Sequence, residues 1–351
     1  MRDVAVVSTA MRQFSAMTDM TEVQLMVRLL EAARSSIGLE QADIGFTCSG
    51  SSDFLAGQAF SFVQTLDAVG AFPPISESHV EMDGAFAFYE AWVKLQIGEI
   101  DTALVYSYGK SSPGSIRDVL ALQFDPYYVA PLWPPSDAVI ALQARQLLEF
   151  GIVSLEGLAE IAVRSQRNAV GNPNAVRASS TVTVCDILAE EVVTDPLRPS
   201  DLAAEADGGC AVVLATGSRA RDLCDRPAWI RGIDHRIDTQ ALGVRDLSTV
   251  PSVVAAAQLA GAMEDRIDLA ELHSLSTSQE ALLLREIGLG SEIEINPSGG
   301  ALAGNTLMAA GLMRIAEAAD RISKGEADRA LAHATSGPCL QQNLICVLEG
   351  A

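Results

Sequence analysis

Positively charged residues are scarce in this chain of 351 residues. Lysine and arginine together number 24 against 45 aspartates and glutamates, so the formal net charge is −21. A charge of this size repels the phosphates of nucleic acids and the surfaces of anionic membranes. A general role in binding polyanions is therefore excluded, and no nucleic-acid partner is expected.

Motifs for metals, disulfides and dinucleotides are also missing. None of the six cysteines forms a C-x-x-C pair or stands at metal-ligand spacing from a histidine, which argues against a zinc site or a disulfide framework. No G-x-G-x-x-G follows the first apolar stretch, so a dinucleotide-binding fold has little support. We expect no metal and no permanently bound cofactor.

Long apolar runs are absent as well. No run reaches the roughly 18 apolar residues of a membrane span, and the apolar stretch at the N-terminus is too short for a signal peptide. These patterns indicate a compact soluble protein without membrane insertion, and the cytoplasm is the expected location. Hydrophobic residues nevertheless make up 49% of the chain, which is ample for large cores.

The most informative feature that the chain does contain is a repeat. Residues 84–104 match residues 311–331 without a gap, Gly84 pairs with Gly311, and the paired positions differ by 227 throughout. Each copy predicts a largely apolar helix followed by a strand. Two such units predict two similar halves around a pair of central helices, which we expect to be antiparallel. The alternative is that the shared pattern is only a common helix-to-strand connector.

Strands and helices alternate along the rest of the chain, which favours an α/β fold with mixed or parallel sheets covered by helices. We predict an N-terminal half at residues 1–220 and a C-terminal half at residues 221–351. Residues from about 110 to 200 break the alternation with turn-rich and helical stretches. They predict an inserted loop or cap segment within the first half.

Three arginines stand close together in that cap segment, although the chain is poor in cations. They are Arg164, Arg167 and Arg177. An acidic protein that holds a phosphorylated ligand needs such a local basic patch. The alternative interpretation is a solvated helix face.

Several short stretches stand where strands deliver residues to helix N-termini, namely residues 78–85, 271–275, 295–305 and 336–343. Their order resembles the thiolase superfamily, in particular the thiolase-like lipid-transfer proteins related to sterol-carrier thiolases and to steroid side-chain aldolases. The resemblance covers essentially the whole chain. It implies the thiolase fold, with two pseudo-repeated βαβ halves in five layers and an inserted loop domain.

The resemblance also implies four catalytic positions. Glu81 stands where the family has its nucleophilic cysteine, and His273 matches the sterol-carrier type of a motif that orients a water or an oxyanion. Asn305 stands where the family has a catalytic histidine, and Cys339 matches the acid/base cysteine without its following glycines. Because a carboxylate does not carry an acyl group as a thioester does, ordinary thiolase activity is not expected. We interpret these groups as suited to proton transfer and enolate stabilisation.

Each of these four residues has a structural alternative. Glu81 would be a helix cap, His273 a core histidine bonded to backbone, Asn305 a loop amide and Cys339 an inert buried thiol. Residues 298–300, which are Ser298, Gly299 and Gly300, are expected with the three arginines to contact coenzyme A. Their alternative role is the close packing of a turn.

The resemblance implies an enzyme that acts on an acyl-CoA thioester, with coenzyme A as part of the substrate. The interpretation we favour is retro-aldol cleavage of a carbon–carbon bond in a β-hydroxyacyl-CoA, such as a sterol or lipid side chain. Two alternatives remain open. One is a catalytically silent subunit that binds acyl-CoA or holds a partner, and the other is an acyltransferase or thiolase that uses another nucleophile.

Partners are implied in the same way. The resemblance implies a homodimer whose interface includes the strand at residues 103–108 and the loop near Gly50, since an exposed apolar strand edge would otherwise favour aggregation. It also implies a small partner with an OB-fold and a zinc ribbon.

Overall fold

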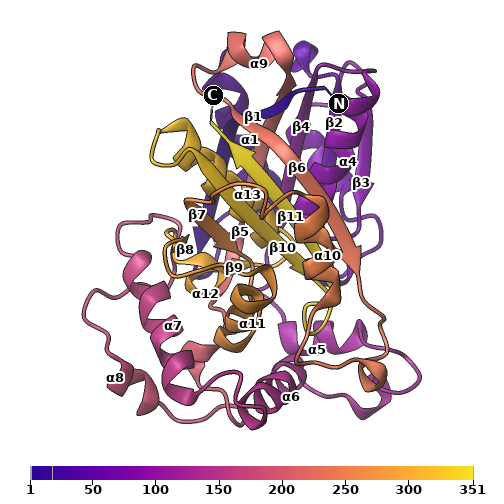
Figure 1. Cartoon of the computed structure of the whole chain (residues 1–351). Coiled ribbons are helices and arrows are strands. Elements are labelled where there is room, and N and C mark those ends of the chain that lie inside the picture. The colour runs from indigo at the N-terminus through magenta and orange to yellow at the C-terminus, as the bar shows by residue number, and fades with distance from the viewer. Residues whose placement is uncertain (1, 18, 351) are drawn as a thin grey trace.

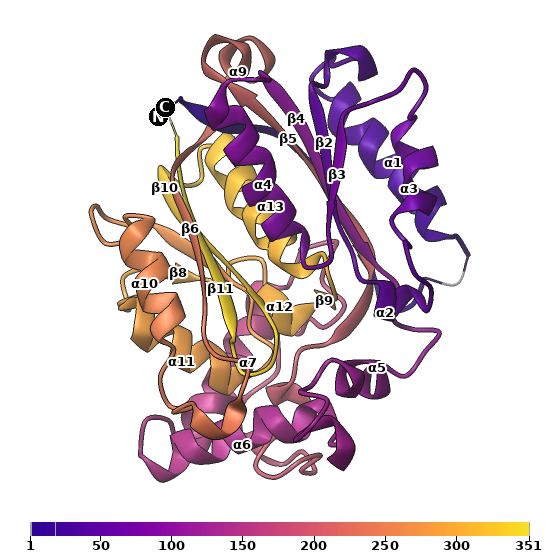
Figure 2. The same cartoon turned by 90° about the vertical axis from the view of Figure 1, so that its right-hand side faces the viewer.

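The computed structural model describes residues 2–17 and 19–350 of the chain. These residues form five layers (Figures 1 and 2). Two halves of one sheet enclose a pair of central helices, and further helices cover the outer faces of both halves. The α/β class and the layered architecture expected from the sequence are confirmed.

The strands repeat one spatial order in the two halves. The first half reads β3-β2-β4-β5-β1 and the second β8-β7-β10-β11-β6, and a short β1–β6 pairing joins them. In each half the pairings among the first three strands are parallel and the others antiparallel. The repeat therefore extends to all five strands of each half, while the expected boundary at residue 220 stays a prediction. The strands are β1 (Val4–Phe14), β2 (Phe46–Gly50), β3 (Glu77–Val80), β4 (Thr102–Gly109), β5 (Glu205–Thr216), β6 (Ala228–Ile237), β7 (Leu269–Leu272), β8 (Glu294–Ile295), β10 (Arg329–Ser336) and β11 (Gln342–Glu349), with β9 (Asn305–Thr306) beside β5.

The helices fall into three groups (Figures 1 and 2). The outer helices are α1 (Glu22–Ser35), α3 (Val63–Val69) and α9 (Gly217–Leu223) on the first half of the sheet, and α10 (Pro251–Leu259) and α11 (Thr277–Ile287) on the second. The central helices are α4 (Gly84–Ile97) and α13 (Ala310–Ser323), whose apolar side chains join both halves of the sheet in the largest core. Short helices α2 (Asp53–Ala56) and α12 (Gly300–Ala303) lie in loops.

The cap consists of α5 (Ile116–Leu122), α6 (Ser136–Glu149), α7 (Leu155–Asn168) and α8 (Val184–Leu188). It covers one end of the layers, at the bottom of Figure 1. These helices lie within the stretch from about residue 110 to 200 in which a cap was expected, and its assignment as an insertion in the first half stays a prediction. The cap matters for function because it closes one side of the cavity described below.

The glycines that pair in the sequence repeat permit the close approach of the central helices. A Cβ atom on Gly84 would lie 2.4 Å from the Cβ atom of Ser107 and 3.0 Å from the Leu312 side chain. A Cβ atom on Gly311 would lie 2.5 Å from Oδ1 of Asp83. The contacts of 2.4 Å and 2.5 Å are shorter than a Cβ atom tolerates, so the two glycines are required by packing.

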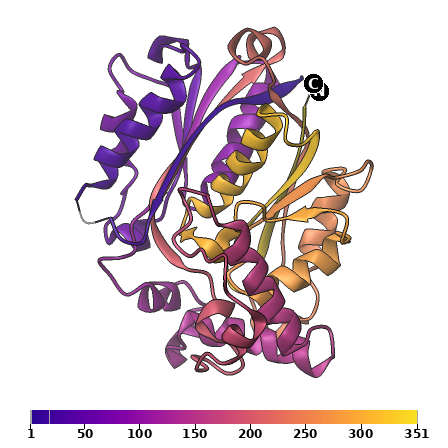
Figure 3. The same ribbon diagram turned by 90° about the vertical axis from the view of Figure 1, so that its left-hand side faces the viewer.

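The central helices run in the same direction, and the expectation that they are antiparallel is wrong. Asp83 accepts hydrogen bonds from Ala85 in the first turn of α4 and from Gly311 and Leu312 in the first turn of α13. The two helices thus begin at one point and lie side by side (Figures 2 and 3). A sequence repeat fixes the order of elements within each half, but it does not fix how the halves are related in space.

The strand expected at a dimer interface lies instead inside the sheet. β4 is flanked by β2 and β5, and all eight of its residues are buried. Gly50 is buried too, since a Cβ atom there would lie 2.7 Å from the backbone of Gly84. The edge of this half is β3, so the expectation that β4 offers an exposed edge for dimerisation is wrong, whereas the loop that follows Gly50 carries exposed side chains such as Phe54. Strand alternation along a sequence does not give strand order in a sheet.

No helix in residues 2–17 and 19–350 combines the length and apolar character that a membrane span requires.

Candidate active site

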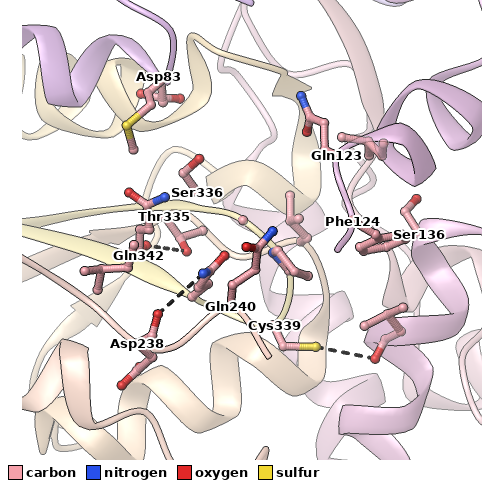
Figure 4. A pocket seen from close by; sticks show the side chains of 18 of the residues that line it. Asp83, Gln123, Phe124, Ser136, Asp238, Gln240, Thr335, Ser336, Cys339 and Gln342 are labelled. Carbon is pink, nitrogen blue, oxygen red and sulfur yellow. Dashed lines mark hydrogen bonds between the residues drawn. The ribbon is translucent and has the colours of Figure 1, made fainter. Parts of the chain in front are cut away.

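A cavity of about 680 Å³ lies beneath the cap, at the end of the layers where both central helices begin (Figure 4). Its volume falls in the range of small-molecule sites. Cap helices α5 and α6 form one wall, with Leu120, Phe124 and Val139 as apolar contacts. The end of β6 and the loop between β10 and β11 form the opposite wall.

The structure brings three of the four expected catalytic residues into this lining. Glu81, His273 and Cys339 all line the cavity, although they are far apart in the sequence. Asn305 is buried next to the site but does not line it, and its Oδ1 atom has no hydrogen-bond partner among the described residues. Their catalytic roles stay a prediction, but the geometry limits what each group does.

His273 follows β7 and is held as a neutral side chain. Its Nδ1 atom accepts a hydrogen bond of 3.4 Å from the backbone N–H of Thr335, and its own backbone N–H donates to His333. Burial lowers the pKa of His273 to about 3, with further lowering by His333 and Arg314, while the Asn305 side chain acts in the opposite direction. A neutral ring that accepts at Nδ1 carries its proton at Nε2.

The Nε2 atom of His273 has no hydrogen-bond partner within the described part of the chain, and the residue lines the cavity. A buried N–H without a partner is costly unless a ligand satisfies it. At neutral pH this group is therefore a hydrogen-bond donor toward the cavity. The lowered pKa and the Thr335 contact favour donation by His273, and the acid/base role expected for this residue stays a prediction.

Glu81 follows β3 at the rim of the cavity and is held from two sides. Its Oε1 atom accepts a hydrogen bond of 2.6 Å from the backbone N–H of Asp53. Its Oε2 atom lies 3.5 Å from Nε2 of His79, whose Nδ1 atom is 3.0 Å from the Ser49 hydroxyl. The ring of Phe62 stacks on His79 with centroids 4.4 Å apart. The Glu81 side chain is still 45% exposed, so a substrate is able to reach this positioned carboxylate.

Cys339 lines the cavity as a thiol and not as a thiolate. Burial raises its pKa to about 12, and its Sγ atom donates to the carbonyl of Val139 on α6 at 3.5 Å (Figure 4). Arg245 donates to the backbone carbonyl of Cys339, and its charge lowers the pKa of the thiol by less than burial raises it. A thiol in this state is a poor nucleophile and a poor base at neutral pH.

Asp83 is a site residue whose role the sequence did not reveal. It is almost fully buried in the cavity lining and accepts three backbone N–H bonds of 2.8 to 3.0 Å where the two central helices begin. Burial raises its pKa to about 6, and the three N–H donors oppose that shift. The positive ends of both helices are thus already satisfied by this carboxyl group. Its position directly before the helix-starting Gly84 was the available signal, since aspartate is a favoured N-cap.

The three cap arginines make contacts within the protein and do not line the cavity. Arg164 pairs with the buried carboxylate of Glu280. Arg167 donates to the carbonyl of Val182, and Arg177 donates to the carbonyl of Leu202. These contacts attach the cap to its surroundings, and coenzyme A binding by the arginines stays an untested prediction.

The predicted coenzyme A contacts at residues 298–300 lie in a buried turn away from the cavity lining. The Ser298 hydroxyl donates to Glu271 and accepts from Arg314, and the carbonyl of Gly299 accepts from Ser165. The Cβ atom of a residue replacing Gly299 would lie 2.7 Å from that of Ala169. The turn is therefore packed tightly against α7, as the structural alternative proposed.

Comparisons with known proteins agree on the fold. No protein-family model matches the chain. The chain is 27% identical over 361 residues to an acetyl-CoA acetyltransferase of Methanothermobacter thermautotrophicus, covering 94% of this chain and 93% of the relative. The structure resembles an Ltp2–ChsH2(DUF35) aldolase with a TM-score of 0.81 at 20% identity, covering 99% of this chain and 97% of that one. It resembles the human mitochondrial 3-ketoacyl-CoA thiolase with a TM-score of 0.80 at 17% identity, covering 100% and 99%. The chain therefore has the thiolase fold.

Proposed function

We propose that the protein is a thiolase-superfamily enzyme that cleaves a carbon–carbon bond in a β-hydroxyacyl-CoA by retro-aldol chemistry. The observation that carries the proposal is the partnerless Nε2–H of neutral His273, which shares one cavity with the positioned carboxylate of Glu81. Retro-aldol cleavage needs a base for the hydroxyl proton and a donor for the enolate oxygen. It needs no thiolate, and Cys339 is not one.

In the proposed reaction Glu81 removes the proton of the β-hydroxyl group. The oxygen electrons form a carbonyl group as the bond between the α- and β-carbons breaks, and the electron pair of that bond passes into the thioester enolate. The Nε2–H of His273 donates to the enolate oxygen. The proton held by Glu81 returns to the α-carbon, which yields a shorter acyl-CoA and an aldehyde or ketone.

Two further facts support this reaction over thiolysis. The resemblance to the thiolase superfamily assigns Glu81 to the nucleophile position, and the helix N-termini that would stabilise a thiolate are already satisfied by Asp83. An aldolase is also among the proteins whose structures this chain resembles.

We also propose a homodimer formed through β3. β3 is an edge of the sheet, and the segments beside it carry exposed Phe54, Phe60 and Phe72. Edge strands and exposed aromatic groups of this kind are covered in stable proteins. Light scattering at micromolar concentration should give twice the chain mass, and a monomer would contradict this proposal. A small acyl-CoA-associated partner with an OB-fold and a zinc ribbon is proposed by analogy with the Ltp2–ChsH2(DUF35) aldolase.

The test of function is product analysis. Purified protein, alone and with the proposed small partner, is incubated with β-hydroxyacyl-CoA substrates that differ in chain length and branching. We expect a shorter acyl-CoA and a carbonyl compound in equal amounts, without added free coenzyme A. Binding of acyl-CoA without turnover under any condition would instead favour the silent-subunit alternative.

A further inference from the structure

The charged residues that line the cavity are all acidic. They are Glu81, Asp83 and Asp238, and among the described residues no lysine or arginine belongs to the lining. This is unexpected for a site proposed to take a coenzyme A ester, whose phosphates are anionic. The phosphates must therefore lie outside the cavity, and only the acyl group and the neutral part of the carrier enter it.

The three carboxyl groups differ in how well their charge is compensated. Asp83 accepts three N–H bonds at two helix N-termini, and Glu81 is held by the Asp53 N–H and by His79. Asp238, which directly follows β6, accepts hydrogen bonds from the hydroxyl and N–H groups of Ser252, both at its Oδ2 atom.

Asp238 forms no ion pair within 4.0 Å among the described residues. The positive charge of Arg245 interacts with the carboxylate of Asp238 without an ion-pair contact. The guanidinium group of Arg245 donates its hydrogen bonds to the carbonyls of Pro338 and Cys339. Asp238 is therefore a negative charge in the lining that no ion pair neutralises among the described residues.

The remaining polar lining is neutral and has unused hydrogen-bonding capacity. The side chains of Gln123, Gln240 and Gln342 lie around the cavity (Figure 4), and none has a protein hydrogen-bond partner in the part of the chain that the structure describes. Together with the apolar wall of Leu120 and Phe124, these amides suit a ligand that is largely apolar but carries oxygen atoms.

We propose that the cavity selects an uncharged acyl group bearing hydroxyl or carbonyl oxygens, and that it rejects an acyl group ending in a carboxylate. We assign a measurable part of the rejection to Asp238, because like charges at short range in a partly buried site repel. This inference rests on the proposed function, since it assumes that an acyl-CoA enters the cavity.

The experiment measures binding of three coenzyme A esters with equal five-carbon chains, namely valeryl-CoA, 5-hydroxyvaleryl-CoA and glutaryl-CoA. Calorimetry with the full chain should place 5-hydroxyvaleryl-CoA tightest and glutaryl-CoA at least about tenfold weaker than valeryl-CoA. Asp238→Asn should strengthen glutaryl-CoA binding by roughly threefold or more and leave valeryl-CoA nearly unchanged, because asparagine still accepts from Ser252. The matched control is Asp234→Asn, which makes the same charge change on β6 outside the lining and should change neither ratio.

The outcomes separate this inference from the proposed function. Equal binding of valeryl-CoA and glutaryl-CoA would overturn the inference and leave acyl-CoA binding intact. Weak glutaryl-CoA binding that Asp238→Asn does not improve would overturn the assignment to Asp238. Failure of all three esters to bind, with or without the proposed small partner, would overturn both the proposed function and the inference.

Discussion

The backbone N–H of Thr335 donates to Nδ1 of His273 at 3.4 Å, and this contact decides what the histidine does. It places the ring proton on Nε2, which has no partner at hydrogen-bond distance among the described residues, and the polar group beside the ring is the Asn305 side chain, whose Oδ1 atom likewise has no partner there. A histidine held in this way is neutral across the physiological range and acts by donating. Two predictions on His273 follow from this relationship.

The first prediction concerns the rate of turnover. His273→Ala removes the donor to the enolate oxygen and should lower kcat by about 100-fold or more, as loss of an oxyanion donor does. His273→Gln places an amide N–H near the position of Nε2 and should recover at least about tenfold of that loss. If His273→Gln is as slow as His273→Ala while both fold normally, donation at Nε2 is not the role of this residue.

The second prediction concerns how the free energy of unfolding changes with pH. The folded pKa of about 3 lies below the ordinary value of 6.5, so between these values the unfolded chain binds more protons. The contribution of neutral His273 to the free energy of unfolding is complete above about pH 6.5, and it is lost as the pH falls below that value. Between pH 7 and pH 5 this costs about 2 kcal/mol. Denaturant titrations at both pH values should show a smaller loss for His273→Gln than for the unsubstituted protein, and equal losses would contradict the buried, neutral state.

A third prediction concerns the cysteines. Cys339 is buried, its pKa is raised to about 12, and its thiol donates to Val139, whereas Cys185 is exposed. Iodoacetamide at pH 8 should therefore label Cys185 and leave Cys339 unmodified, as read by peptide mass spectrometry. Rapid alkylation of Cys339 in the folded protein would show that a thiolate is available and would reopen the acyltransferase alternative.

A fourth prediction concerns the carboxyl group that joins the central helices. Asp83→Ala removes the cap of both α4 and α13 and leaves three buried N–H groups without partners. The free energy of unfolding should fall by roughly 2–4 kcal/mol. Thr21→Ala, which removes the cap of the single outer helix α1, is the control and should cost about 1 kcal/mol. Equal losses in the two variants would show that Asp83 does not join the helices.

The sequence predicted the parts of this molecule that depend on local pattern. The repeat that pairs Gly84 with Gly311 predicted two like halves, and both glycines are required where the central helices approach their neighbours. The order of motifs placed Glu81, His273 and Cys339 at one end of the fold, and all three line the same cavity.

What the sequence did not predict depends on contacts between distant segments. The tautomer of His273 depends on an N–H from β10, and Arg164 is neutralised by Glu280 on a helix more than a hundred residues away. The common starting point of α4 and α13 is seen in the hydrogen bonds that Asp83 accepts from both helices. No spacing of residues along the sequence indicates any of these contacts, because the partners are neighbours only in the folded protein.

The most direct test of the central claim is mass spectrometry of the products formed from a β-hydroxyacyl-CoA in D2O. Retro-aldol cleavage with enolate protonation predicts a shorter acyl-CoA carrying one deuterium at the new α-position, an equal amount of carbonyl compound, and no acyl adduct on the intact protein. A covalent acyl adduct on the protein, or product that forms only when free coenzyme A is added, would contradict the account.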